Sequence, residues 1–173
     1  MNIHIRGSDA QDLDALYHTE ISATTLYHQS GFDMKDVTAR TLQDLEQLLK
    51  ETTVLVAEND EGNVMGYISY FQNGPYLHLE EVGVSTLYQR KGVGQTLLST
   101  YIESGNKNGI LGYTLTTFKN AFWSIELYKK LGFEELGYMN DDFDTDVLKE
   151  IIQRDIQAGL DMNQRVLMIK LKK

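Results

Sequence analysis

The chain has 173 residues, which suits one domain with a sizeable hydrophobic core. Hydrophobic residues make up 42% of it, which excludes a disordered chain, and a net charge of −9 argues against non-specific binding to nucleic acid. There is no cysteine, which excludes disulfides, thiolate–zinc sites and an acyl-cysteine intermediate.

The N-terminal half alternates short strands and helices. Its first residues lack the apolar core of a signal peptide, and no apolar run in the chain approaches the length of a membrane span, so we expect a cytoplasmic protein with no membrane partner. The patterns predict, in order, a strand over 3–6, a helix from a cap at Ser8 or Asp9 to about Glu20, a loop or broken helix over 24–35, a helix over 41–50, a hairpin of strands 54–57 and 64–71, and a strand over 76–84.

The C-terminal half carries strand–helix–strand patterns. It predicts a helix from Val93 that ends near Gly105 or Gly109, a strand over 113–117, a helix over 122–130, a strand from Gly132 and a last strand over 165–171. Antiparallel hairpins followed by such units predict one α/β domain over 1–173, with a mixed sheet and helices on both faces.

Residues 141–164 are expected to form an extra helical segment before the last strand. Asp141, Asp142, Asp144 and Asp146 place carboxylates at the start of this helix. Negative charge is favourable at a helix N-terminus, so a well-capped, solvated helix start is one interpretation. The other is a lid or a dimer contact that also attracts a cationic substrate.

The turn Gln89-Arg90-Lys91-Gly92-Val93-Gly94 lies between a predicted strand and a predicted helix. Glycine lets a ligand approach the backbone closely, and the unpaired N–H groups and dipole of a helix N-terminus attract an anion. Arg90 and Lys91 supply the local positive charge that an acidic protein needs there. The turn is neither a Walker loop nor a full dinucleotide fingerprint, and two glycines alone would also suit a helix entrance that merely needs a tight turn.

Two motifs together indicate a family. Tyr88 to Gly94, followed by Leu97-Leu98, resembles the acyl-CoA signature Q/R-x-x-G-x-G/A of the GNAT superfamily of N-acetyltransferases. Leu115 to Phe118 and Leu127 to Phe133 resemble its second signature, in the right order. The resemblance covers roughly residues 3–139 and implies an α+β fold with a mixed, mostly antiparallel sheet of about seven strands flanked by helices. It also implies acetyl-CoA as co-substrate and direct acetyl transfer to an amine.

The resemblance implies a set of cofactor-binding groups. Backbone N–H groups around the pyrophosphate would come from the glycine-rich turn: Gln89, Arg90, Lys91, Gly92, Val93, Gly94 and Gln95. An amide of Val82 or Val84 would polarise the thioester where two neighbouring strands part. Asn120 or Ser124 would bond the pantetheine arm, and the spacing to Tyr128 leaves that choice open.

The candidate base lies on the strand over 76–84. Side chains alternate along a strand, which places four of them on one face: His78, Glu80, Val82 and Val84. Glu81 then points the other way. The resemblance implies that Glu80 removes the acceptor's proton directly or through water, with His78 as relay or substitute. A solvated edge glutamate and a hydrogen-bonded structural histidine are the alternatives.

The candidate acid is Tyr128. The resemblance places this tyrosine near the CoA sulfur, where it can protonate the leaving thiolate. A phenol has a pKa of about 10 and carries its proton at neutral pH. The alternative is a tyrosine packed on a helix face with its hydroxyl satisfied.

The predicted function is therefore N-acetyltransfer from acetyl-CoA to a primary amine. The acidic composition favours a small cationic amine or polyamine, with specificity in 17–35 and 141–164. Alternatives are acetylation of a protein N-terminus or lysine, or a non-catalytic acyl-CoA-binding regulatory domain. The scattered histidines predict no metal site, no nucleophile elbow is present, and a homodimer is left open.

Overall fold

The computed structural model describes residues 1–33, 37–107, 109–136 and 145–172. The described residues form a seven-stranded sheet in the order β1-β2-β3-β4-β5-β7-β6. Its strands are β1 (His4–Gly7), β2 (Thr53–Glu58), β3 (Val64–Asn73), β4 (Tyr76–Val84), β5 (Gly112–Phe118), β6 (Glu134–Leu136) and β7 (Arg165–Leu171). The β4–β5 pair is parallel, whereas β1–β2, β2–β3, β5–β7 and β6–β7 are antiparallel. The predicted mixed, mostly antiparallel sheet is confirmed.

The helices follow the predicted order. They are α1 (Leu13–Gln29), α2 (Leu42–Glu51), α3 (Val93–Lys107), α4 (Phe122–Lys130) and α5 (Thr145–Gln157), with short 3₁₀ turns η1 (Ala10–Asp12), η2 (Thr86–Tyr88) and η3 (Met162–Gln164). Contacts divide the chain into two compact units. The first holds Met1–Phe71 and Glu80–Lys107, and the second holds Gln72–Leu79 and the described residues after 108. The strand β4 therefore contributes its first four residues to the second unit and its last five to the first.

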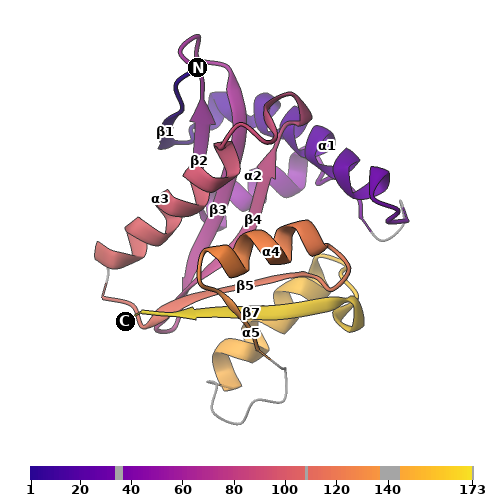
Figure 1. The fold of residues 1–173 in the computed structure, drawn as a ribbon, viewed down its shortest axis with the longest axis vertical. Helices are drawn as coiled ribbons and strands as arrows, with labels where there is room; N and C mark the ends of the chain where they lie inside the picture. The colour runs from indigo at the N-terminus through magenta and orange to yellow at the C-terminus, as the bar shows by residue number, and fades with distance from the viewer. Residues whose placement is uncertain (34–36, 108, 137–144, 173) are drawn as a thin grey trace. The chain divides into compact units, whose positions relative to one another are not determined.

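In the first unit, alternation along β3 decides which helix meets which face. Tyr67 joins a buried cluster with leucines of α1 and α2 and with two valines of β2: Leu16, Leu45, Leu48, Val54 and Val56. Tyr70, whose side chain points to the opposite face of β3, packs against Tyr101 of α3 in a tilted arrangement with ring centroids 5.2 Å apart. Helices α1 and α2 therefore cover one face of these strands and α3 the other (Figure 1).

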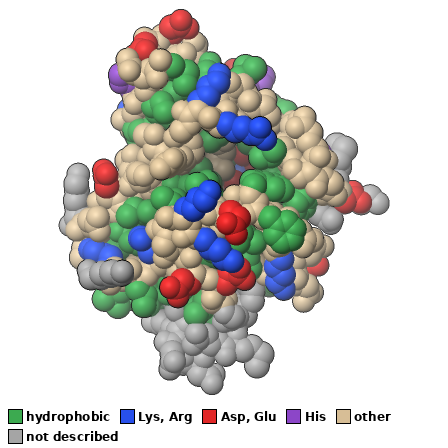
Figure 2. All heavy atoms as spheres, in the orientation of Figure 1, with side chains coloured by type: hydrophobic (Ala, Val, Ile, Leu, Met, Phe, Trp, Pro, Cys, Tyr) green, Lys and Arg blue, Asp and Glu red, His purple; other side chains and the backbone are tan. Residues whose placement is uncertain are grey.

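In the second unit, β7 shows the same alternation. Leu167 packs in a buried cluster with Val147 and Ile151 of α5. Lys170, at a position of opposite parity, donates from Nζ to the carbonyl oxygen of Leu131 at the end of α4, at 2.7 Å. Helices α5 and α4 thus cover opposite faces of these strands (Figure 1). Figure 2 shows acidic and basic side chains interspersed over the region of α4.

The predicted end of the first helix was wrong, because α1 continues past Glu20 to Gln29. β-Branched threonines and hydroxyl side chains blur the apolar period in this stretch. In the structure these hydroxyls bond back to helix carbonyl oxygens, Thr24 to Glu20 and Thr25 to Ile21, at 2.8 and 3.1 Å. The predicted cap was right at Asp9, which forms a capping box with Asp12.

The strand expected from Gly132 begins two residues later, at Glu134. Gly132 has φ +87°, a left-handed conformation that ends α4 instead of starting a strand. The predicted acidic positions Asp141, Asp142 and Asp144 lie outside the described residues, and α5 is described from Thr145.

Candidate functional site

The glycine-rich turn contains two residues in the left-handed conformation. Arg90 has φ +59° and Gly92 has φ +87°. A non-glycine residue in the left-handed region is strained by about 1–3 kcal/mol, and such strain clusters at ligand sites. The helix α3 begins at Val93, directly after Gly92, so the last residues of the turn carry the first unpaired N–H groups of the helix. Alternating backbone of this kind makes a concavity for a phosphate.

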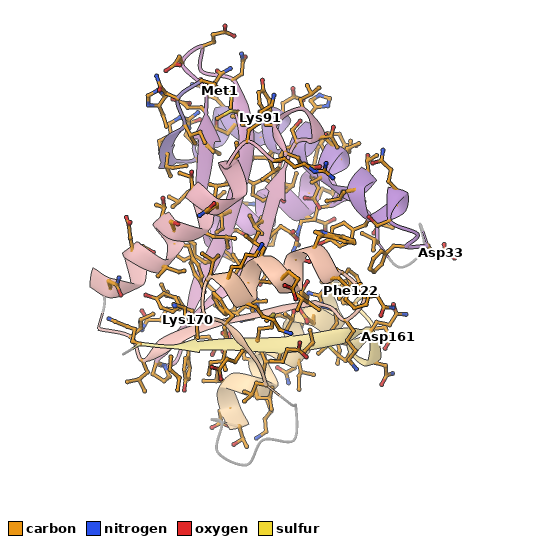
Figure 3. All side chains as sticks on the ribbon, in the orientation of Figure 1. Met1, Asp33, Lys91, Phe122, Asp161 and Lys170 are labelled. Atoms are coloured by element: carbon orange, nitrogen blue, oxygen red, sulfur yellow. The ribbon has the colours of Figure 1, made fainter. Side chains whose placement is uncertain are left out.

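Side chains fix the turn on both sides. Gln89 Nε2 donates to the carbonyl oxygen of Val84 at 3.2 Å, which ties the turn to the end of β4. Lys91 Nζ lies 5.5 Å from the centre of the Tyr88 ring. Arg90, Lys91 and Gln95 are exposed, as a phosphate ligand requires, and Figure 3 shows Lys91 extending from the turn that precedes α3. Gly94 packs next to the side chain of Val84, since a Cβ on Gly94 would lie 3.6 Å from Val84 Cγ2.

Helix α1 is joined to the segment that leads into this turn. The backbone N–H of Thr86 donates to Ser22 Oγ at 2.9 Å, and the two hydroxyl oxygens lie 2.9 Å apart. Ser22 belongs to the part of α1 that sequence patterns did not predict as helix. The longer helix therefore supports the entrance to the candidate anion site.

Just before the turn, Gly66 of β3 and Gly83 of β4 occupy positions that leave no room for a side chain. A Cβ on Gly66 would stand 2.7 Å from the carbonyl oxygen of Gly83 and 3.2 Å from side-chain atoms of Val84 and Val93. A Cβ on Gly83 would meet the Tyr67 ring at 3.0 Å. Two facing glycines thus set the position of β4 at the residues predicted to polarise a thioester. Val82 and Val84 are half-buried there.

Glu80 and Glu81 lie beside an arginine that sequence reasoning missed. Arg40 Nη2 is 3.6 Å from Glu80 Oε1 and 3.6 Å from Glu81 Oε2. The Glu80 side chain is 13% exposed and that of Glu81 is 33% exposed. The pKa of Arg40 is raised: burial alone would lower it, but the surrounding negative charges, Glu81 first among them, outweigh that effect.

Arg40 is also linked to a buried hydrogen-bonded pair, Tyr67 and Glu20. Tyr67 Oη donates to Glu20 Oε2 at 2.6 Å, and the backbone N–H of Arg40 donates to Glu20 Oε1 at 3.2 Å. Burial, followed by the charge of Glu20, raises the pKa of Tyr67 well above its ordinary value, so the phenol keeps its proton. A signal was present in the sequence, since Glu20 follows Leu13 and Leu16 on one helical stripe where an apolar residue is expected.

His78 lies in the second unit, on the face of the strands that α5 covers. Its side chain is 2% exposed and its Nδ1 is 2.9 Å from Thr114 Oγ1, the residue opposite it in the parallel ladder. Burial, with smaller effects from Arg154 and Arg165, lowers the pKa of His78 to about 3. The imidazole is therefore neutral at physiological pH. These observations favour the structural histidine that the sequence left open as an alternative.

Tyr128 lies on α4 and its side chain is 6% exposed. Its ring meets the Phe133 ring edge-on with centroids 6.0 Å apart, and its carbonyl oxygen accepts the N–H of Phe133. The second signature, Leu127 to Phe133, thus forms the end of α4 and the turn that follows it, and the contacts with Phe133 fix the position of Tyr128. Tyr128 and His78 belong to the second unit, whereas Glu80 and the glycine-rich turn belong to the first.

Asn120 and Ser124 differ in their freedom to bind a ligand. Asn120 is exposed in the turn before α4. Ser124 is buried, and its hydroxyl donates to the carbonyl oxygen of Ala121 at 3.0 Å and lies 3.4 Å from Thr117 Oγ1. The hydroxyl of Ser124 is therefore committed within the protein, which favours Asn120 as the ligand contact.

Within the described ranges, no group of three or more His, Cys, Asp or Glu side chains is placed to hold a metal ion. The described helices also include none that is long and apolar enough to cross a membrane.

Residues 13–133 match the acetyltransferase (GNAT) family. The chain belongs to this family and is an N-acetyltransferase. It is 28% identical over 152 residues to an L-methionine sulfoximine/L-methionine sulfone acetyltransferase of Pseudomonas paraeruginosa, a match covering 80% of this chain and 84% of that protein. It is 29% identical over 104 residues to "Probable N-acetyltransferase 14" of Xenopus tropicalis, a match covering 56% of this chain but only 50% of that protein.

Solved structures share the fold. The PaiA N-acetyltransferase of Thermoplasma acidophilum, solved in complex with coenzyme A, superposes with a TM-score of 0.74 at 17% identity over 99% of this chain and all of that one. The ribosomal-protein-alanine N-acetyltransferase of Brucella melitensis superposes with a TM-score of 0.68 at 25% identity, over 98% of this chain and 99% of that one. The α+β fold with its mixed sheet is therefore that of the family.

Proposed function

We propose that this protein transfers the acetyl group of acetyl-CoA directly to a primary amine, and that the acceptor is a small cationic amine or polyamine. The observation that carries the choice of acceptor is the charge beside β4. Glu80 and Glu81 each lie 3.6 Å from the guanidinium of Arg40, and Glu20 accepts the backbone N–H of Arg40, so three carboxylates lie around one arginine. An ammonium group is the ligand that such a site attracts.

The glycine-rich turn is the proposed site for the pyrophosphate of acetyl-CoA. Its left-handed residues, its position before α3 and its exposed Arg90 and Lys91 support this assignment. Phosphates carry negative charge, which the helix dipole and the two cations stabilise together. The coenzyme A bound in the structure of the Thermoplasma relative is consistent with it.

Glu80 is the proposed base and Tyr128 the proposed acid. The base removes a proton from the acceptor ammonium, and the free amine attacks the thioester carbonyl. The carbonyl oxygen becomes an oxyanion that an amide of Val82 or Val84 stabilises. The C–S bond then breaks and Tyr128 protonates the leaving thiolate. The nitrogen loses its second proton, which returns to the Tyr128 phenolate directly or through solvent, so that the products are the acetamide and the CoA thiol. The proposal keeps His78 outside the reaction, as a buried neutral residue bonded to Thr114.

Two relatives define the competing acceptors. The Pseudomonas protein is named for amino-acid acceptors and the Brucella protein for alanine of a ribosomal protein. An amino acid adds a carboxylate next to the amine, which the acidic surroundings of Glu80 would repel. A protein N-terminus brings a polypeptide with it, and an acceptor of this kind is tested by short peptides.

The test is release of CoA thiol from acetyl-CoA with a panel of amines. The panel holds polyamines, simple diamines, amino acids and short peptides, with Glu80→Gln measured alongside. The proposal expects release with the diamines and polyamines and a loss of about 100-fold or more in the variant, the usual size of general-base catalysis. Faster release with amino acids or peptides would refute the proposed acceptor. Binding of acetyl-CoA without transfer to any amine would favour a regulatory domain.

A further inference from the structure

The network around Arg40 joins four segments of the first unit. Glu20 lies on α1, Tyr67 on β3 and Glu80 with Glu81 on β4, while Arg40 is in the connection that precedes α2. Arg40 contacts this network twice: its backbone N–H donates to Glu20, and its guanidinium lies between the two β4 carboxylates. The backbone hydrogen bond fixes the main chain of Arg40, and the two ion pairs fix the guanidinium at the end of its side chain.

Glu20 is held in turn by a buried donor. Its side chain is 6% exposed, and both of its oxygens are occupied, one by Tyr67 Oη and the other by the N–H of Arg40. A buried carboxylate that accepts two hydrogen bonds is a rigid anchor, because leaving either oxygen without a partner is costly. The backbone of Arg40 is therefore fixed to α1 and β3 through Glu20.

Glu80 and Glu81 are consecutive like charges. Without a cation between them, their carboxylates repel and turn away from each other into solvent. Strand alternation predicted that Glu81 points away from Glu80, but both carboxylates reach the same atom, since Arg40 Nη2 is 3.6 Å from an oxygen of each. The distance is that of an ion pair and is longer than a hydrogen bond.

We propose that Arg40 is a positioning residue for acetyl transfer, and that Glu20 and Tyr67 fix it in place. The inference rests on the proposed role of Glu80. In the step, a proton passes from the acceptor ammonium to Glu80, so that an N–H bond breaks and an O–H bond forms. Arg40 keeps its own proton throughout. Its contribution is to hold the Glu80 carboxylate in the orientation that this transfer needs.

The test compares alanine variants of two arginines. Arg40→Ala is expected to lower kcat by about 10- to 100-fold, the cost of a catalytic group displaced by about 1 Å, while KM for acetyl-CoA stays within about twofold. Arg6→Ala is the matched control, because Arg6 also pairs with two carboxylates of the first unit, Asp12 and Glu58 at 2.7 Å, but lies on β1. Its kcat is expected to equal that of the wild type.

Guanidinium ion provides the readout that a purely structural role would not move. Added at tens of millimolar, it is expected to restore several-fold activity to Arg40→Ala and none to Arg6→Ala. Tyr67→Phe removes one of the two hydrogen bonds to Glu20 and leaves the side chain of Arg40 intact, so it is expected to lower kcat less than Arg40→Ala does. Wild-type kcat in Arg40→Ala, or a loss that guanidinium leaves unchanged, would overturn the inference.

A measurement without turnover separates this inference from the proposed function. Side-chain ¹⁵N resonances of Arg40 are expected to show restricted rotation of its Nη groups, lost in the double variant Glu80→Gln/Glu81→Gln. Free rotation of these groups in the wild type would contradict the positioning role of Arg40, whatever the activity of the protein. Absence of acetyl transfer in a wild type whose Arg40 is restrained would overturn the proposed function alone.

Discussion

Gly66 is the glycine of the first unit at which substitution by alanine should destabilise the protein most. An alanine Cβ there would stand 2.7 Å from the carbonyl oxygen of Gly83, a backbone atom that cannot rotate away. The same Cβ would stand 3.2 Å from methyl groups of Val84 and Val93. The two strands must therefore separate, and that moves both residues that border the candidate anion site.

The size of the effect follows from these contacts. Relieving the contact to Gly83 needs a shift of roughly half an ångström, and overpacking of this kind costs about 1–3 kcal/mol. For a protein of this length that is a fall in Tm of about 2–12 °C. We also expect acetyl-CoA affinity to fall by about tenfold, because the cofactor loop leaves from the displaced end of β4, and a tenfold change is about 1.4 kcal/mol.

The assay is urea denaturation followed by circular dichroism, with calorimetric titration of acetyl-CoA. Gly7→Ala is the matched control, since a Cβ on that β1 glycine meets nothing within 4 Å. It should be neutral or stabilising by up to about 1 kcal/mol. Equal free energies of unfolding for Gly66→Ala and Gly7→Ala would show that the close approach of β3 and β4 carries no energetic consequence.

Three further variants test the roles of Tyr128, Gly94 and His78. Tyr128→Phe should lower kcat about tenfold or more with acetyl-CoA affinity nearly unchanged, and equal turnover would remove this hydroxyl from the reaction. Gly94→Trp should abolish acetyl-CoA binding in calorimetry, and normal binding would contradict the anion site. His78 has a pKa of about 3 in the folded protein against an ordinary 6.5, so its contribution to stability is complete above pH 6.5 and is lost as the pH falls toward 3. Between those values wild type should lose about 1.4 kcal/mol more per pH unit than His78→Gln in urea denaturation, and parallel pH profiles would rule out a buried neutral imidazole.

The fold was largely predictable because its elements carry strong local signals. The hairpin of β2 and β3 turns at residues 59–63, and the cap at Asp9 is a local motif. The second half of α1 was missed since its stabilising contacts are tertiary: Ser22 bonds Thr86, 64 residues away. No window of neighbouring residues contains that information.

The candidate site was predictable only where motifs carry it. The glycine-rich turn and Tyr128 lie inside signatures of contiguous residues, so the sequence alone was enough to propose them. Arg40 belongs to no motif and meets Glu80 only through folding. The preference for Asn120 over Ser124 rests on burial and on the hydrogen bond from the Ser124 hydroxyl, which spacing cannot show.

The order of strands in the second unit has a consequence for synthesis on the ribosome. β7 lies between β5 and β6 and pairs with both, although it is made after them. Until Arg165–Leu171 has left the exit tunnel, β5 has an unpaired edge and β6 has no neighbour in the sheet. Open strand edges recruit other chains, so the nascent protein is most prone to aggregate during this interval. A pause in translation shortly before codon 165 would lengthen that exposure, and the first unit, whose residues end at Lys107, would already be complete.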